Sequence, residues 1–460
     1  MHNEQAGRWR RDFDSAVLVR IRPITVEGTM KKGSERTHLG VRQWLCFIVL
    51  GLAGQFAWTI ENMYFNVFLY NTISDDPGYI AAMVAASAVA ATLTALVMGT
   101  VSDRVGKRKV FIVAGYLLWG LSTAAFGFIT VQNASALFPS LNAAAAAAWT
   151  VVVMDCVMTF FGSTANDAAF NAYITDSTDP SNRGRVESVL ATLPLISMLI
   201  IFGAFDGMTQ RGEWQKFFLL FGGSVVFTGL LALFLVRDAP IVRSEASALR
   251  DLFYGFRPSV MKQNRSLYLA LSSHMVASIA VQVFFPYLIV YMQHGLGLSN
   301  YAIVLGVALI VASAASVLAG PFANRVGTMK CVLPAAALML VGLVLMYFAR
   351  GMVFVTVSGC VLMSGYILLM AMLSAAVRDR TPKDKAGMFQ GIRMIFSVLI
   401  PMVIGPFIGA AVIKNNPNTY NDLGTIKNLP TPAIFLAAAV VLLFVTIPAL
   451  ALKRSEEKRQ

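Results

Sequence analysis

Carboxylates and hydroxyls inside long apolar stretches are the residues of this chain whose types and spacing could do chemistry. The stretch MDCVMTFFGSTANDAAFNAYITDS contains Asp155 and Asp167, which would lie roughly 18 Å apart along a helix. Ser163, Asp167 and Asn171 follow at intervals of four, so a helix places them on one face, with Asn166 beside them. A carboxylate among oxygen neighbours can bind sodium, or it can carry a proton because burial disfavours its charged form. We therefore predict Asp167 as the first candidate for coupling an ion.

The stretch LGLAGQFAWTIENMYFNVFLY carries another carboxylate and a polar face. Glu61 and Asp155 are the further coupling candidates, although Asp155 could instead be a charge in an outer vestibule. Four polar residues fall within about 60° of one another at 3.6 residues per turn: Gln55, Thr59, Asn62 and Asn66. Aromatic residues flank that face: Trp58, Tyr64 and Phe65. Amides beside aromatic rings suit a polyhydroxylated solute, although the same amides could instead hydrogen-bond between helices.

His274, Ser278 and Gln282 form a third stripe at intervals of four, which we expect to face the same site from the second half of the chain. The predicted solute-binding residues are Gln55, Trp58, Thr59, Asn62, Asn66, Asn171, His274 and Gln282. The Gly-Lys pair at 106–107 is followed by Arg rather than Ser or Thr, so it is no phosphate-binding loop. The histidines are scattered among unrelated segments. We expect no enzyme, no metal site and no cofactor other than a coupling proton or sodium ion.

The elements that must position these residues follow from a strongly apolar composition. The mean hydropathy is +0.66, and 57% of the residues are hydrophobic while 13% are charged, which is typical of a protein in lipid. About 20 apolar residues cross the hydrocarbon core as a helix, and the apolar stretches are continuous rather than alternating as in barrel strands. We predict twelve spans: 43–71, 78–101, 110–130, 147–174, 187–206, 215–236, 267–292, 300–322, 331–349, 352–377, 388–413 and 431–452.

The predicted spans divide six and six around a polar linker. The expected order is a cytoplasmic extension at 1–40, a bundle at 41–236, a cytoplasmic linker at 237–266, a bundle at 267–452 and a cytoplasmic tail at 453–460. With both termini inside, 31 of the 37 Lys and Arg residues fall on the inner side and five on the outer side, in agreement with the positive-inside rule. The net charge of +13 therefore indicates topology and contact with the lipid bilayer. We expect a monomeric protein of a cell (inner) membrane that binds a small solute and no nucleic acid.

The charged segment GTVSDRVGKRKV recurs once in a weakened form. Its Gly-x-x-x-Asp-Arg-x-Gly pattern begins at Gly99 and includes Asp103 and Arg104. The second copy, GPFANRVGTMKC, has Asn324 and Arg325 at the corresponding positions. Both copies join the second predicted span of a half to its third. This implies a parallel repeat about an axis normal to the membrane.

These residues resemble the signature of the major facilitator superfamily. The resemblance covers residues 41–452 and implies an all-α membrane protein of two six-helix bundles, related by a pseudo-twofold axis normal to the membrane, that transports by alternating access. It further implies a cytoplasmic gate, in which Asp103 docks against the start of the eleventh helix near Gly387. The implied gate residues are Gly99, Asp103, Arg104, Gly106, Arg108, Asn324 and Arg325. We expect Gly99 to allow close approach of a neighbouring helix, and the second copy, which has lost its acid, to be structural.

The loop DSTDPSNRGRVES is similar to one in the glycoside–pentoside–hexuronide cation symporters, the melibiose-carrier branch. That resemblance implies sugar uptake with sodium or protons through carboxylates on helices 2 and 4, but the second predicted span here contains none. The alternative is a proton-coupled drug efflux antiporter, whose Arg in helix 4 and Gly-Pro bend in helix 5 are missing from this sequence. We therefore predict cation-coupled uptake of a sugar-like or other small polar solute.

Overall fold

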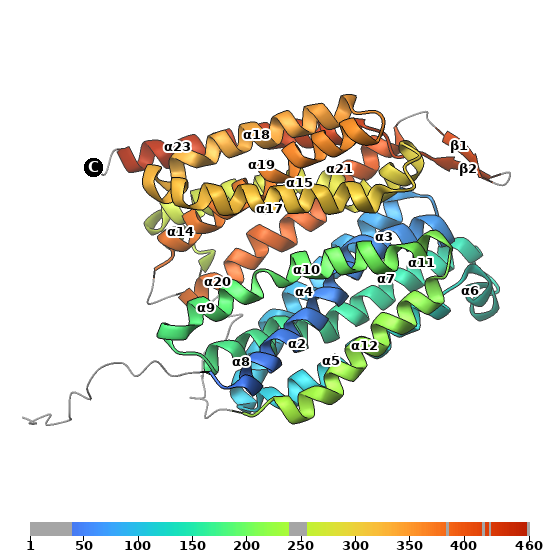
Figure 1. The fold of residues 1–460 in the computed structure, drawn as a ribbon, viewed down its shortest axis with the longest axis horizontal. Helices are drawn as coiled ribbons and strands as arrows, with labels where there is room; N and C mark the ends of the chain where they lie inside the picture. Colours follow the sequence, from blue (N-terminus) through green and yellow to red (C-terminus); the bar gives the residue numbers. More distant parts are fainter. Residues whose placement is uncertain (1–38, 239–254, 383–385, 416–418, 423–424, 458–460) are drawn as a thin grey trace, which may run out of the picture. The chain divides into compact units, whose positions relative to one another are not determined.

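The computed structural model describes residues 39–238, 255–382, 386–415, 419–422 and 425–457. Within this part of the chain, twelve helices are long and apolar enough to cross a membrane (Figure 1). Nearly all of the predicted extension 1–40 lies outside the described residues, as do 239–254 of the predicted linker and 458–460 of the predicted tail.

The first half of the chain contains spans 1 to 6, which run Val41–Ile73, Pro77–Val105, Arg108–Phe128, Ala143–Asp176, Arg185–Gln210 and Trp214–Leu235. Several spans change helical type along their length. The α-helices are α2 (Val41–Thr59), α3 (Phe65–Phe68), α4 (Pro77–Val105), α5 (Arg108–Ala125), α6 (Val131–Leu137), α7 (Ala143–Gly162), α8 (Asn171–Asp176), α9 (Pro180–Leu190), α10 (Leu193–Ile200), α11 (Asp206–Gln210) and α12 (Trp214–Leu235). The π-helical segments are η1 (Ile60–Tyr64), η2 (Leu69–Ile73), η4 (Ser163–Phe170) and η5 (Ile201–Phe205), and η3 (Phe126–Phe128) is a 3-10 turn.

The second half contains spans 7 to 12, which run Arg265–Gly295, Tyr301–Ala319, Met329–Phe348, Met352–Arg380, Gly391–Lys414 and Ala433–Arg454. Its α-helices are α14 (Pro258–Gln263), α15 (Arg265–Phe284), α16 (Leu288–Val290), α17 (Tyr301–Val326), α18 (Thr328–Phe348), α19 (Met352–Arg380), α20 (Ala386–Met394), α21 (Ile400–Lys414), α22 (Ala433–Leu443) and α23 (Thr446–Glu457). The segments η7 (Tyr291–Gly295) and η9 (Ile395–Leu399) are π-helical, and η6 (Phe285–Tyr287) is a 3-10 turn. Strands β1 (Thr419–Asp422) and β2 (Thr425–Asn428) pair antiparallel.

All twelve predicted spans are present, so the all-helical membrane fold predicted from the sequence is confirmed. The helix α14 and the strand pair β1–β2 were not predicted. We call the end of the spans that carries β1 and β2 the hairpin end, and the opposite end, where α4 meets α5, the basic end (Figure 1).

The boundaries of α4 show how local chemistry sets the ends of a span. Pro77 is its first residue, where the missing N–H costs nothing, and the carboxylate of Asp76 accepts a hydrogen bond from Gly78 N at 2.7 Å. At the other end Gly106 has a φ of 69°, which glycine adopts without steric penalty, and this stops the helix. The charged segment therefore spans the end of α4, with Asp103 and Arg104 in the last turn of the helix and Lys107 directly after the C-cap.

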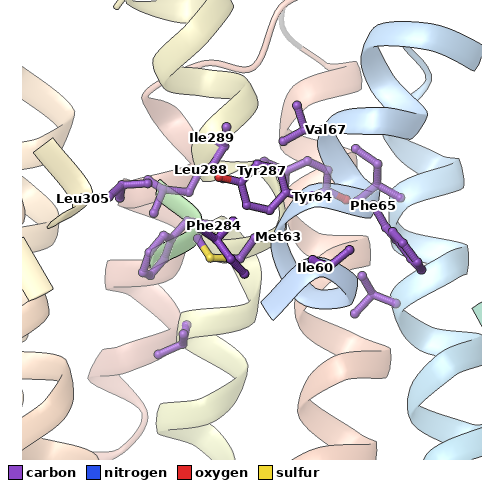
Figure 2. Packing of buried hydrophobic residues seen from close by; sticks show 14 of the residues in the cluster. Ile60, Met63, Tyr64, Phe65, Val67, Phe284, Tyr287, Leu288, Ile289 and Leu305 are labelled. Carbon is purple, nitrogen blue, oxygen red and sulfur yellow. The ribbon is translucent and has the colours of Figure 1, made fainter. Parts of the chain in front are cut away.

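Buried side chains from both halves form one cluster. Figure 2 shows Met63 and Tyr64 of span 1 in the same cluster as Phe284 and Tyr287 of span 7 and Leu305 of span 8. All five are nearly inaccessible. The two halves are thus in apolar contact in the part of span 1 that lies toward the hairpin end.

Spans 3 and 6 make the closest backbone approach among the glycine contacts of the first half. A Cβ atom on Gly120 would lie 2.5 Å from Gly222 O, and one on Gly222 would lie 2.6 Å from Ala124 N. Small residues permit this approach, which is a main source of helix association in membranes. The pair of spans is consequently intolerant of added volume at these positions.

We predict that Gly222→Ala destabilises the protein while Gly223→Ala does not. The first change pushes a methyl group into the backbone of span 3, whereas a Cβ on Gly223 meets nothing within 4 Å. Overpacking of this kind costs about 1–3 kcal/mol. Thermal unfolding of the purified protein in detergent should show a lower Tm for Gly222→Ala alone, and equal Tm values for the two variants would contradict the packing described.

Candidate functional site

A polar cavity of about 220 Å³ lies among spans 1, 4 and 5, toward the basic end. Its lining residues are Gly51, Gln55, Trp58, Asn166, Asp167, Phe170, Asn171, Ile174, Leu190 and Leu193. Four of the residues singled out from the sequence as binding or coupling candidates are among them: Gln55, Trp58, Asp167 and Asn171. The wall therefore combines three carboxamides, one carboxylate and one indole ring.

Asp167 is held in place within span 4 by its neighbours one turn away. Its Oδ2 accepts a hydrogen bond from Ser163 Oγ at 2.9 Å, and Asn171 Nδ2 donates to the Asp167 carbonyl at 3.3 Å. The predicted stripe is thus present, although the backbone over η4 is π-helical rather than α-helical. Such segments occur often at functional sites. Asp167 is half-buried, so its charge is accessible to a molecule in the cavity.

The other two coupling candidates meet on the hairpin side of this cavity. Glu61 Oε1 accepts hydrogen bonds from Ser87 Oγ of span 2 at 2.5 Å and from Thr159 Oγ1 of span 4 at 3.0 Å. The two hydroxyl oxygens are 2.9 Å apart. The buried Asp155 carboxyl of span 4 lies within electrostatic range of the Glu61 carboxyl. Three spans therefore converge on one pair of carboxyl groups.

Each carboxyl group of this pair keeps a buried oxygen without a partner. Glu61 is 7% exposed and Asp155 is 1% exposed, so the alternative of an outer-vestibule charge at Asp155 is wrong. In the part of the chain that the structure describes, Glu61 Oε2 and Asp155 Oδ1 accept no hydrogen bond. Two adjacent buried carboxyl groups need a compensating cation or a proton, because an unpaired charge is costly to bury. The geometry suits either one.

Thr59, Asn62 and Asn66 do not line the cavity with Gln55. Instead each bonds the carbonyl four residues earlier: Thr59 to Gln55 O at 2.7 Å, Asn62 to Trp58 O at 2.8 Å and Asn66 to Asn62 O at 2.8 Å. Thr59 Oγ1 also lies 3.2 Å from Ser197 Oγ of span 5. Because η1 begins at Ile60, the α-helical spacing that would align Asn62 and Asn66 with Gln55 is interrupted. Thr59 precedes this turn, and its hydroxyl is instead taken up by Gln55 O and Ser197 Oγ. Their role in solute binding stays a prediction.

Tyr64 and Phe65, which we expected to flank the solute face, belong to the core. Phe65 stacks on Phe126 of span 3 with ring centroids 4.0 Å apart, and the Tyr64 hydroxyl donates to Asp206 Oδ1 at 2.9 Å. Both side chains have no exposed surface. The same π-helical turn explains the difference, since it displaces residues that follow Ile60 around the helix.

The predicted stripe on span 7 is formed, but it is not part of this cavity. His274 lies 3.2 Å from Ser278 Oγ and 3.3 Å from Ser374 Oγ of span 10. Gln282 packs against span 11, since a Cβ on Gly405 would lie 2.4 Å from the Gln282 Cβ. His274 and Gln282 therefore contact neighbours within the second half, and their role in solute binding also stays a prediction.

A buried arginine organises the turn at the basic end. Arg108, 4% exposed, pairs through Nη2 with Asp103 Oδ1 at 2.5 Å and through Nε with Asp176 Oδ2 at 3.0 Å. Its Nη1 donates to Ser102 Oγ at 2.8 Å. One planar guanidinium thus joins the ends of spans 2, 3 and 4, a geometry that suits arginine better than lysine.

The structure tests only some of the predictions made for the other signature residues. The observed partner of Asp103 is Arg108. The surroundings of Gly387, its predicted docking point, and the side chains of Asn324 and Arg325 near the end of α17 lie outside what the structure describes. Arg104 is exposed. The predicted close approach at Gly99 is wrong, since a Cβ there would meet nothing within 4 Å.

Several residues of these networks were missed from the sequence. Ser87 and Thr159 are isolated hydroxyls in apolar helices, and nothing in their local spacing marks them. Asp176 was treated as part of a loop, although an acid near the end of an apolar stretch is a usable signal for an inner ion pair. Asp206 is the last residue of the fifth predicted span. An acid at the end of an apolar stretch could have marked it as a member of a polar network.

Comparison with known proteins identifies the family of this fold. The family model of the Major Facilitator Superfamily matches residues 46–406 and again 273–460. A mutant of the nucleoside transporter NupG has a similar structure, with a TM-score of 0.69 and 12% identity, covering 89% of this chain and 99% of that one. A bacterial homologue of the human lysosomal transporter Spinster, inward-facing and unoccupied, has a TM-score of 0.62 and 12% identity, covering 89% and 95%. No curated protein matches.

We predict that Arg108→Lys lowers the thermal stability and that Arg104→Lys does not. A lysine ammonium cannot reach Asp103, Asp176 and Ser102 together, and the loss of charge-assisted hydrogen bonds of this kind costs about 1–3 kcal/mol. Arg104, an exposed residue of the same turn, is the matched control. Unfolding followed in detergent should separate the two variants, and a stable Arg108→Lys variant would show that the guanidinium fork is dispensable.

Proposed function

Because the chain belongs to the major facilitator superfamily, we propose that it is a secondary transporter that takes up a small polyhydroxylated solute, such as a sugar, together with a proton or sodium ion. One observation carries this proposal. The polar cavity and the buried carboxyl pair are built on the same two spans, 1 and 4, at neighbouring levels. Binding at the cavity or at the carboxyl pair therefore acts on spans that also form the other of these two sites.

The cavity has the chemistry and size for a small polar solute. Gln55, Asn166 and Asn171 offer both donors and acceptors to hydroxyl groups. The Trp58 ring can cover an apolar sugar face, and Asp167 can accept from hydroxyls. Its volume of about 220 Å³ is below the roughly 300–1,000 Å³ of pockets for drug-sized ligands. This favours a compact solute over the bulkier cargo of a drug exporter.

The carboxyl pair is the second component of coupling. Glu61 and Asp155 do not line the cavity, so an ion bound there is separated from the solute. Binding a cation or a proton removes the repulsion between two buried carboxylates and so favours the packing of spans 1, 2 and 4 seen here. A ligand that stabilises one arrangement of shared helices also changes the affinity of the other site, which is the requirement for coupled transport. Asp167 remains the candidate at which solute and ion could compete directly.

The distribution of charge supports an orientation for this transport. The basic end carries Arg104, Lys107, Arg108 and Lys109, which the positive-inside rule places at the cytoplasmic face of a cell membrane. The hairpin end is then the outer side. The cavity lies toward the basic end, so the solute leaves it toward the cytoplasm during uptake.

We predict that Asp167→Asn abolishes gradient-driven accumulation and weakens solute binding. The change removes a charge that faces the cavity while it preserves the size of the side chain. The assay is uptake into proteoliposomes under an imposed proton or sodium gradient, with labelled monosaccharides, disaccharides and nucleosides as probes. Nucleosides are included because the structurally similar NupG transports them. Glu187→Gln, an exposed carboxylate outside the cavity, is the matched control. Normal accumulation by Asp167→Asn would remove Asp167 from coupling.

Glu61→Gln is expected to separate exchange from accumulation. The glutamine keeps an acceptor for Ser87 and Thr159 but cannot bind or release a proton, and it binds sodium far more weakly. Exchange of labelled for unlabelled solute should persist, while accumulation against a gradient should fall tenfold or more, by analogy with the loss of one charge-assisted interaction. Loss of both activities in a folded variant would assign Glu61 to solute binding instead, and full accumulation would exclude it from coupling.

A further inference from the structure

A third buried carboxylate lies at the hairpin end and is used by neither the cavity nor the ion site. Asp206 is the first residue of α11 and is 2% exposed. Its Oδ1 accepts hydrogen bonds from Tyr64 at 2.9 Å and Tyr301 at 2.5 Å, and its Oδ2 accepts one from Gln210 Nε2 at 2.6 Å. Tyr64 belongs to span 1 and Tyr301 begins span 8. The carboxylate therefore joins the two halves of the chain.

Further hydrogen bonds extend this contact on both sides, and two of them cross between the halves. Gln210 Nε2 also donates to Ser299 O at 3.0 Å. The Tyr301 hydroxyl in turn accepts from Gln293 Nε2 at 3.2 Å. Gln293 Oε1 accepts from Asn71 Nδ2 at 3.3 Å. Separating the halves at this end requires the bonds of Tyr301 to Asp206, of Gln210 to Ser299 and of Asn71 to Gln293 to be replaced by water.

Water can reach the network from an adjoining cavity. A space of about 300 Å³ is lined by side chains of both halves, including Gln210 and Tyr301. A buried carboxylate that loses hydrogen bonds is strongly penalised unless it is rehydrated. The cavity provides that rehydration, so Asp206 can hold the halves together and still release them.

One turn of helix links this contact to the ion site. Glu61 and Tyr64 are both in η1, three residues apart. Glu61 is held by Ser87 and Thr159, whereas Tyr64 is held by Asp206. A π-helical turn closes its backbone hydrogen bonds over five residues rather than four, so a change to α-helical bonding would rotate the side chains of this turn relative to one another. Movement of the turn on ion binding at Glu61 would therefore move the Tyr64 hydroxyl relative to Asp206.

We propose that Asp206, Tyr64 and Tyr301 form a clamp that closes the hairpin end, and that Tyr64 is the positioning residue through which ion occupancy at Glu61 sets the strength of the clamp. The second clause rests on the proposed function, because it takes Glu61 as the ion site. The first clause rests only on the contacts of Asp206. The two clauses can be tested separately.

The clamp is tested by the distance between the halves at the hairpin end. Spin labels at Ser135→Cys and Val353→Cys, both exposed, report this distance by pulsed electron resonance in a background without native cysteines, in lipid nanodiscs and without solute. Tyr301→Phe should increase the population with longer distances about tenfold, since it removes a hydrogen bond to a charged group. Tyr291→Phe is the matched control, because among the described residues the buried Tyr291 hydroxyl has no hydrogen-bond partner.

An unchanged distance distribution in Tyr301→Phe would overturn the clamp, whatever the transport assay shows. Asp206→Asn is the second variant and should act in the same direction as Tyr301→Phe. Both variants are checked for a retained unfolding transition, so that an opened bundle is not confused with an unfolded one. A shift of equal size in Tyr291→Phe would also overturn the assignment, because it would reflect loss of any buried hydroxyl.

The link to the ion site is tested by a double-mutant cycle on the same distance. Glu61→Gln should shift the ratio of short to long distances in the parent protein by several-fold and should have little further effect in Tyr64→Phe. Equal shifts in both backgrounds would overturn transmission through Tyr64 while leaving the clamp intact. If Glu61→Gln has no effect on distance but abolishes accumulation, the link fails and the proposed function stands. If it affects distance but leaves accumulation normal, the proposed ion site fails instead.

Discussion

The most demanding constraint on this structure is the burial of carboxyl groups within apolar helices. Glu61, Asp155 and Asp206 are almost inaccessible, and none of them takes part in an ion pair of the described chain. The fold supports them with hydroxyl and amide donors, which stabilise a charge less completely than a cation does. Arg108 at the basic end shows the other solution, because there a cation is built in. The difference separates an ion pair built into the fold from buried carboxyl groups for which the described chain supplies no cation.

Three of the carboxyl groups in the spans, those of Glu61, Asp167 and Asp206, also share a backbone environment, whereas Asp155 lies in the α-helix α7. Glu61 lies in η1, Asp167 lies in η4, and η5 ends immediately before Asp206. A π-helical turn leaves the backbone hydrogen bonds satisfied while it offsets the side chains that follow. In a membrane this matters, because an unsatisfied backbone group has no water to bond. The turns therefore supply local freedom of movement at the points where ions and gating contacts are expected, without breaking the spans.

The sequence predicts those parts of this structure that depend on local pattern. Twelve spans follow from the length of apolar runs, and the contact of Ser163, Asp167 and Asn171 follows from their spacing. Partners far apart in the chain do not follow, as the contacts of Glu61 with span 2 and of Arg108 with Asp176 show. The face from Thr59 to Asn66 was predicted by α-helical geometry that a π turn interrupts, and no residue type in η1 marks that turn. Close packing such as that of Gly120 on Gly222 decides which helices meet. This pairing could not be predicted from the sequence, because small residues are common in the other spans as well.

The two kinds of helix contact suit two different mechanical tasks. Within a half, glycines bring backbones into direct contact, as at Gly120 and Gly222 or at Gly342 against Leu362, and such packing cannot slide without steric conflict. Between the halves at the hairpin end, apolar packing is accompanied by polar contacts, such as the hydrogen bonds of Asp206 with Tyr301 and of Gln210 with Ser299 and the ion pair of Lys414 with Asp76. The hydrophobic effect gives little preference for joined over separated helices in a membrane, because lipid tails are as apolar as the side chains. Directional bonds that water can replace do give such a preference and can be reversed. Rigid halves joined by exchangeable polar contacts are what alternating access requires.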